Sequence, residues 1–193
     1  MKIICFGDSN TYGYENLNFM GGRYDADARW VDLLSEKTGW TIINEGVNGR
    51  EIPRRSVCFP TDTDLLIIML GTNDLLQGNN ASKVVNRMDN FINNLPIEKE
   101  KILLIAPPPM KQGFWVPTEE LIRESYKLAS GYELLAQQSG LFYTNAGDWN
   151  IDLVFDGIHF SKEGHRSFAK ELFDYLIHIL PFEQTVTSQK SSI

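Results

Sequence analysis

The sequence predicts an α/β protein, in which one parallel sheet lies between two layers of helices. Short, continuously apolar segments such as residues 3–6 and 65–70 are typical of parallel strands that are covered on both faces. These segments alternate with longer amphipathic segments at helical spacing, which favours a doubly wound sheet in a three-layer α/β/α sandwich. Polar turns follow the apolar segments directly. A flavodoxin-like sheet with the strand order 2-1-3-4-5 is therefore expected.

The individual elements follow from apolar periodicity and from the residues that end each pattern. We expect strands over residues 3–6, 40–44, 65–70, 101–106 and 141–144. We expect helices over residues 29–37, 82–95, 118–138 and 162–180. Gly39 and Gly140 lie just past two of these helices, where glycine commonly ends a helix, and Ser161 can cap the last one. Residues 11–27, 50–63 and 148–161 are expected to be loops, and residues 71–74 a polar turn after the third strand.

Length and composition indicate one globular domain, over residues 1–182, followed by a polar tail over residues 183–193. The chain has 193 residues, of which 42% are hydrophobic and 22% charged, as is ordinary for a globular protein. Its net charge of −7 disfavours binding to nucleic acid or to an acidic membrane surface. We also expect no signal peptide and no membrane span. Cys5 and Cys58 form no disulfide framework, so a cytoplasmic location is expected.

Three residues that follow predicted strands could meet at one edge of the sheet. Ser9 follows the first strand, Gly49 the second and Asn73 the third. In the expected strand order these three strands are neighbours, so the residues would face one crevice. Ser9 could act as a nucleophile, while its own N–H, the N–H of Gly49 and the amide of Asn73 could stabilise an oxyanion. The alternative for Ser9 is a structural role as a cap of the following helix.

A serine hydroxyl needs a base at neutral pH, and the chain has three histidines. His165 and His178 fall within the predicted last helix and are expected to be structural or solvated. His159 closes the sequence Asp-Gly-Ile-His, in which Asp156 could accept a hydrogen bond from one ring nitrogen and leave the other as a base. The alternative for this segment is an ordinary surface turn.

Other classes of site are weaker candidates. The chain has no Gly-x-Ser-x-Gly motif and no cluster of residues with metal-ligand spacing, so neither an α/β-hydrolase elbow nor a metal site is expected. The residues after the first strand could instead cradle a phosphate, as in a flavodoxin-like binding module. Arg50, Arg54 and Arg55 form a local basic cluster, interpreted as a solvated loop, with contact to an anionic substrate as the alternative.

Taken together, four blocks resemble those of the SGNH (GDSL) hydrolase superfamily of serine esterases. They are Gly7-Asp8-Ser9, Gly49, Gly71-Thr72-Asn73-Asp74 and Asp156-Gly157-Ile158-His159, in the same order and across almost the whole chain. The chain is most similar to bacterial arylesterases and acyltransferases, a likeness that rests further on Arg29-Trp30, Pro107-Pro108-Pro109 and Phe160. Position 10 is Asn where the name-giving motif has Leu. Gly46 competes with Gly49 for the second block, and we choose Gly49 on spacing.

The resemblance implies a nucleophile, a base and an oxyanion hole. Ser9 would be the nucleophile, His159 the general base and Asp156 its orienting partner. The Ser9 N–H, the Gly49 N–H and the Asn73 side chain would hold the oxyanion. The expected activity is hydrolysis of short-chain acyl esters, including aryl esters or acetylated sugars, without a cofactor or metal. A catalytically silent carbohydrate-binding scaffold is the alternative within the superfamily.

The substrate and the assembly of the protein are less defined. The candidate pocket walls are aromatic or apolar residues near the nucleophile and after the proline run: Tyr12, Tyr14, Phe19, Met20, Phe114 and Trp115. The related arylesterases suggest a homo-oligomer.

Overall fold

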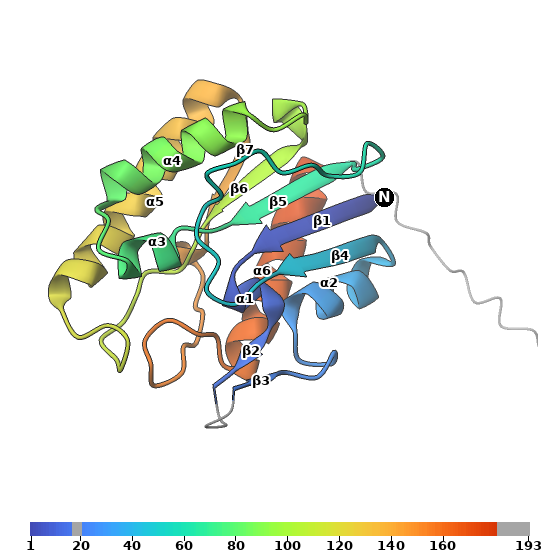
Figure 1. Cartoon of the computed structure of the whole chain (residues 1–193). Helices are drawn as coiled ribbons and strands as arrows, with labels where there is room; N and C mark the ends of the chain where they lie inside the picture. Colours follow the sequence, from blue (N-terminus) through green and yellow to red (C-terminus); the bar gives the residue numbers. More distant parts are fainter. Residues whose placement is uncertain (17–20, 181–193) are drawn as a thin grey trace, which may run out of the picture.

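The computed structural model describes residues 1–16 and 21–180, and its central feature is a parallel sheet of five strands (Figure 1). The strands are β1 (Lys2–Gly7), β4 (Thr41–Gly46), β5 (Leu65–Met69), β6 (Ile102–Ala106) and β7 (Phe142–Asn145). Their spatial order is β4-β1-β5-β6-β7. Counted along the chain, this is the order 2-1-3-4-5, so the predicted topology is confirmed. The predicted tail over residues 183–193 lies outside the described residues.

Helices cover both faces of this sheet and make the three-layer sandwich that the sequence predicts. α2 (Trp30–Thr38) packs beside α6 (Lys162–Ile179) on one face, and α4 (Ala81–Asn93) packs beside α5 (Glu119–Ser139) on the other. The shorter elements are α1 (Ser9–Tyr12), α3 (Thr72–Leu76), the antiparallel pair β2 (Tyr14–Glu15) and β3 (Gly22–Arg23), and the 3₁₀ turns η1 (Lys99–Lys101) and η2 (Ala146–Asp148).

Two hydrophobic cores form because neighbouring side chains of a strand point to opposite faces. The even-numbered residues of β1, β5 and β6 pack against α4 and α5, and they include Ile4, Phe6, Leu66, Ile68, Ile102 and Leu104. The odd-numbered residues pack against α2 and α6, and they include Ile3, Cys5, Leu65, Ile67, Leu103 and Ile105. Burial on both faces explains why these strands are apolar throughout.

The predicted signals at the helix ends are confirmed. Gly39 and Gly140 follow α2 and α5 with φ angles of 69° and 70°, in the left-handed region that favours glycine. The side chain of Ser161 caps α6 by accepting a hydrogen bond from the Gly164 N–H at 3.0 Å.

Two segments differ from the prediction. The segment 11–27 was expected to be a loop, but it contains the end of α1 and the pair β2–β3. The polar turn expected at residues 71–74 opens α3. Both helices are short, with four and five residues, so neither spans enough residues to produce an apolar periodicity in the sequence.

Candidate active site

Ser9 lies at the carboxyl end of β1, at the start of α1. The Asp8 side chain caps this helix by accepting a hydrogen bond from the Asn10 N–H at 3.0 Å. Gly7 is needed for the turn, because a Cβ atom there would lie 2.0 Å from the Thr11 Oγ1 atom. Asp8, and not Ser9, is therefore the cap of α1, so the structural alternative for Ser9 is wrong, and the Ser9 hydroxyl faces the histidine loop.

The loop before α6 brings an imidazole and a carboxylate to this serine. Nε2 of His159 lies 2.9 Å from the Ser9 Oγ atom, and Nδ1 of His159 lies 2.6 Å from the Asp156 Oδ2 atom. The other carboxylate oxygen, Oδ1, accepts hydrogen bonds from the N–H groups of Ile158 and His159 at 2.9 and 3.0 Å. These contacts form one continuous hydrogen-bond chain from the hydroxyl to the carboxylate.

The surroundings of Asp156 keep this carboxyl ionised. Burial raises the pKa of Asp156, but the hydrogen bonds from the His159 ring and from the two backbone N–H groups outweigh burial, so its net pKa is lowered. An ionised Asp156 accepts a hydrogen bond from the protonated Nδ1 of His159. Nε2 then carries no proton and can accept a hydrogen bond from the Ser9 hydroxyl. The Tyr14 ring lies 4.7 Å from the His159 ring, measured between centroids, and covers one side of it.

Three potential oxyanion donors border the same space. Within the described residues, the N–H groups of Ser9 and Gly49 have no hydrogen-bond partner. Gly49 has a φ angle of 72° in a turn that the Arg50 N–H closes onto the Val47 carbonyl at 3.1 Å. The Nδ2 atom of Asn73 lies 3.2 Å from the Arg50 carbonyl oxygen and 3.4 Å from the Asp8 Oδ2 atom, so its amide is held in place by long hydrogen bonds.

The two glycines that compete for the second block have different surroundings. Gly46 ends β4, and a Cβ atom there would lie 2.0 Å from the Tyr12 backbone nitrogen, so Gly46 permits close packing of α1 on β4. Gly49 lines the cavity beside Ser9. Of the two glycines, Gly49 is thus the one that borders the space beside Ser9.

The cavity in front of Ser9 has a volume of about 450 Å³. It is lined by Ser9, Tyr14, Asn48, Gly49, Asn73, Leu76, Gln77, Trp115, Ile158 and His159. Of the predicted pocket walls, Tyr14 and Trp115 line this cavity. Tyr12 does not, since its ring lies against the Arg23 guanidinium at 4.5 Å. Phe114 is 71% exposed and contacts the edge of Trp115, whereas Phe19 and Met20 lie outside the described residues.

Two asparagines of this site were not predicted. The Asn10 side chain joins α1 to the histidine loop: Nδ2 donates to the Ile158 carbonyl, and Oδ1 accepts from the Phe160 N–H, both at 2.9 Å. Asn16 donates a hydrogen bond from Nδ2 to the Asp156 Oδ2 atom. Asn10 occupies the position where the sequence departs from the name-giving motif, and this departure was the available signal.

Residues 1–16 and 21–180 contain no group of three or more histidine, cysteine, aspartate or glutamate residues that could hold a metal ion. No helix in these residues is long and apolar enough to span a bilayer.

Comparison with known proteins identifies the family of this site. The profile of the GDSL-like lipase/acylhydrolase family matches residues 5–167. The chain belongs to this family. The match includes Ser9, Gly49, Asn73 and the loop with Asp156 and His159, so the resemblance predicted from the sequence is confirmed, and the chain is an esterase-type enzyme. No curated protein sequence is similar enough to count as a match.

Solved structures of the same fold include arylesterases and a carbohydrate acetylesterase. An aryl esterase from M. smegmatis is 24% identical, with a TM-score of 0.78, and covers 93% of this chain and 99% of its own. A carbohydrate acetylesterase from Sinorhizobium meliloti is 25% identical, with a TM-score of 0.76 and the same two coverages. A putative arylesterase from Agrobacterium tumefaciens is 25% identical, with a TM-score of 0.77 and again the same coverages. This GDSL-like chain thus shares its whole fold with them.

Proposed function

We propose that this enzyme is a serine esterase that hydrolyses short-chain acyl esters through an acyl-enzyme intermediate. The observation that carries the proposal is the hydrogen-bond chain from the Ser9 hydroxyl through His159 to Asp156, with distances of 2.9 and 2.6 Å. These three hydrogen-bonded residues supply a nucleophile, a base within reach of its proton and a carboxylate that orients the base.

In the first step, the Ser9 Oγ atom attacks the ester carbonyl carbon while Nε2 of His159 takes the hydroxyl proton. The carbonyl oxygen becomes an oxyanion, which accepts hydrogen bonds from the N–H groups of Ser9 and Gly49 and from the Asn73 amide. When the tetrahedral intermediate collapses, the bond to the alcohol oxygen breaks, and His159 returns its proton to the leaving alcohol. Asp156 stays ionised and stabilises the imidazolium.

In the second step, a water molecule attacks the acyl-serine carbonyl, with His159 as the base that takes the water proton. The new oxyanion occupies the same three donors. Collapse releases the carboxylic acid and returns the proton to the Ser9 oxygen. An alcohol that replaces the water would give acyl transfer instead of hydrolysis.

The cavity supports a small acyl group and an aromatic or sugar-like alcohol. Its volume of about 450 Å³ is near the lower end for ligand pockets. Tyr14, Leu76, Trp115 and Ile158 give it apolar walls around the polar donors. The flat indole face of Trp115 suits an aryl group or the apolar face of a sugar ring, consistent with the aryl and carbohydrate esters named for the similar structures.

The proposal also includes the domain that carries the activity, the kind of substrate and the cellular compartment. We assign catalysis to the domain over residues 1–182 and propose a small-molecule ester as its partner. Cys5 is buried in β1, whereas Cys58 is exposed, and both are free thiols. Free thiols of this kind support a reducing compartment such as the cytoplasm.

The decisive experiment is hydrolysis of p-nitrophenyl acetate by the wild type, by Ser9→Ala and by Ser82→Ala, in which an exposed serine of α4 is replaced. We expect Ser9→Ala to lose turnover while keeping the wild-type unfolding temperature, and Ser82→Ala to retain full turnover. Turnover that persists in Ser9→Ala would refute Ser9 as the nucleophile. A wild type that hydrolyses no short-chain ester would refute the esterase proposal.

A further inference from the structure

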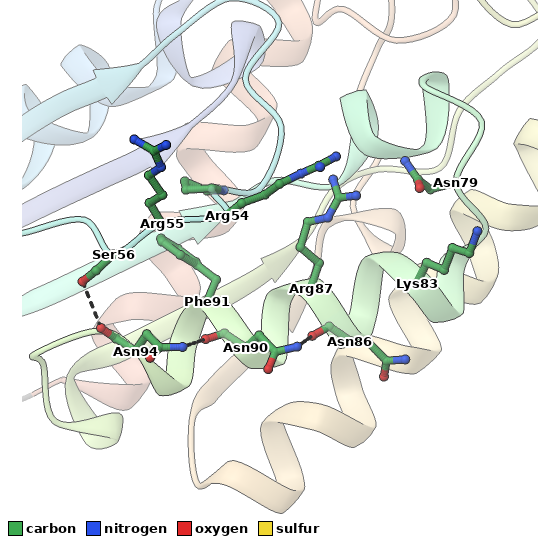
Figure 2. Close-up of a pocket in the computed structure, with 11 residues that line it drawn as sticks. Arg54, Arg55, Ser56, Asn79, Lys83, Asn86, Arg87, Asn90, Phe91 and Asn94 are labelled. Carbon is green, nitrogen blue, oxygen red and sulfur yellow. Dashed lines mark hydrogen bonds between the residues drawn. The ribbon is translucent and has the colours of Figure 1, made fainter.

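A second cavity lies between residues 53–56 and one face of α4 (Figure 2). Its volume is about 600 Å³. It is lined by Pro53, Arg54, Arg55, Ser56, Asn79, Lys83, Asn86, Arg87, Asn90, Phe91 and Asn94. None of these residues lines the cavity in front of Ser9. The second cavity is therefore a separate feature of the surface.

The charge of this cavity is opposite to that of the whole protein. Four of its lining residues are cationic and none is acidic, although the net charge of the chain is −7. Arg87 is neutralised from behind by Glu51, at 3.0 Å, and by the buried Asp74. In the described part of the chain, the side chains of Arg54, Arg55 and Lys83 form no ion pair or hydrogen bond. These three cations leave the cavity with an unbalanced positive charge.

The cavity also offers a group of hydrogen-bond acceptors. The amide nitrogens of Asn90 and Asn94 donate to the carbonyl oxygens one turn earlier in α4, at 2.8 and 2.7 Å, as the dashed lines in Figure 2 show. The amide nitrogen of Asn79 donates to the Asp74 carbonyl at 2.8 Å. Each of these bonds uses one of the two N–H groups of an amide, and the side-chain oxygens of the three asparagines have no partner among the described residues. Such oxygens accept hydrogen bonds from hydroxyl groups.

The walls of the cavity are joined through one buried carboxylate. Asp74 accepts a hydrogen bond from the Ile52 N–H at 3.0 Å and pairs with Arg87 of α4. This arrangement ties the segment that carries Arg54 to the helix that carries the asparagines. Figure 2 shows the ends of Arg54 and Arg87 extending toward the same region of the cavity. The two walls that carry the cationic residues are thus joined through Asp74, and Arg87 is held in place by its ion pairs.

We propose that this cavity binds a small anionic carbohydrate, such as a sugar phosphate or a sugar acid. Arginine suits planar or tetrahedral oxyanions because its guanidinium can donate two parallel hydrogen bonds, and lysine adds a point charge. The asparagine oxygens accept hydrogen bonds from the sugar hydroxyls. The ligand class follows from these two sets together: the cations attract an anion, and amides with a free oxygen and a free N–H match sugar hydroxyls, which both donate and accept hydrogen bonds.

Calorimetric titration of the full chain at low, constant ionic strength tests this inference. The probes are glucose 6-phosphate and glucuronate, with glucose and inorganic phosphate as partial ligands. We expect one or both anionic sugars to bind at one site per chain and more tightly than either partial ligand. Preference for the first probe identifies the anion as a phosphate, and preference for the second identifies a carboxylate.

A matched pair of variants locates the binding. Arg54→Gln/Lys83→Gln removes two cations from the cavity, and we expect affinity to fall by about 100-fold, since each charged hydrogen bond contributes about tenfold. Arg123→Gln/Arg166→Gln removes two exposed cations elsewhere and should leave the affinity unchanged. Absence of binding by both anionic sugars would overturn the proposal. Equal binding of inorganic phosphate, or equal losses in the two double variants, would also overturn it. None of these outcomes bears on ester hydrolysis.

Discussion

At the scale of single residues, Asn73 is the side-chain donor on which the proposed oxyanion hole depends. Its Nδ2 atom donates two long hydrogen bonds, at 3.2 and 3.4 Å, and a developing oxyanion can replace the longer one as acceptor. We predict that Asn73→Ala lowers kcat for p-nitrophenyl acetate by about 10²–10³-fold, the usual effect of removing one such donor. Gln77→Ala changes another residue of the same cavity and should leave kcat near the wild-type value. An unchanged kcat in Asn73→Ala would remove Asn73 from the hole.

Asn10 is a positioning residue, because it holds the loop that carries His159. Its side chain bonds to the backbone on both sides of His159, at Ile158 and Phe160. Asn10→Leu would leave a buried carbonyl and a buried N–H unpaired, and each unpaired group costs about 1–3 kcal/mol. We therefore predict a lower free energy of unfolding and a loss in kcat that is larger than the change in KM.

Chemical denaturation and steady-state kinetics test this role of Asn10. Asn93→Leu, at an exposed position of α4, is the control for a leucine in place of an asparagine. A variant that is destabilised but keeps the wild-type kcat would show that Asn10 is structural only. Wild-type stability together with wild-type kcat would contradict both parts of the prediction.

Some residues of this site could be predicted from the sequence, and others could not. Asp156 and His159 are three residues apart, so their pairing is visible as a local motif. The contact between Asn10 and Phe160 joins residues 150 positions apart, and a side chain that bonds to backbone leaves no complementary residue type to look for. The only signal for Asn10 was its departure from the name-giving motif, and the bond between Asn16 and Asp156 joins residues 140 positions apart. Ser9 and Asn73, in contrast, were indicated by their places after apolar strands.

At the scale of secondary-structure elements, burial decides which segments could be predicted. β5 and β6 are buried on both faces, so each forms an apolar run that is visible in the sequence. α1 instead consists of polar residues that are buried around the active site. It is held by the Asp8 cap and by close packing on Gly46. These tertiary contacts, and not helix propensity, make the segment helical, which explains why a loop was expected there.

α6 carries a buried histidine that makes the fold sensitive to acid. His165 is fully buried, and its Nε2 atom has no partner among the described residues. The rings of Tyr24 and Phe160 lie 5.3 Å from its ring. Burial lowers the pKa of His165 from 6.5 to about 3. Because this histidine stays neutral in the folded state, its contribution to stability is complete above pH 6.5 and is lost as the pH falls toward 3.

We predict that His165→Leu reduces this acid sensitivity. Relative to the wild type, the variant should gain about 2 kcal/mol in free energy of unfolding between pH 7 and pH 5, because protonation of the unfolded histidine no longer favours unfolding. Urea denaturation at both pH values measures this difference. Burial raises the pKa of Asp8 to about 6, so Asp8 favours folding as the pH falls. Because both proteins contain Asp8, its effect cancels when the variant is compared with the wild type. Parallel pH profiles for the two proteins would contradict the prediction.

At the scale of the whole molecule, the active-site cavity forms where the segments after the five strands of the main sheet meet, with Gly49 from the segment after β4. Tyr14 comes from the pair β2–β3, Asn73 from α3, Trp115 from the segment before α5 and His159 from the loop before α6. The strand order made the meeting of the first three strand ends predictable. It did not determine which loop side chains turn inward, because loop conformation depends on specific contacts such as the Trp115 N–H bond to the Asp156 carbonyl at 3.1 Å.

Trp115 and Phe114 offer a test of which aromatic residue the substrate contacts. Trp115 lines the cavity, whereas the neighbouring Phe114 is 71% exposed and lies outside it. Stacking of two aromatic rings contributes about 0.5–1.5 kcal/mol, so Trp115→Ala should lower kcat/KM for phenyl acetate by about 2–10-fold. The effect on ethyl acetate, which has no ring, should be smaller, and Phe114→Ala should change neither substrate. Because stacking acts on a bound aromatic group, the loss should fall mainly in KM.

Two outcomes would contradict this prediction. Equal losses for both esters would show that Trp115 shapes the cavity without recognising the aryl group. A larger effect of Phe114→Ala would place the alcohol group outside the cavity, on the exposed aromatic surface.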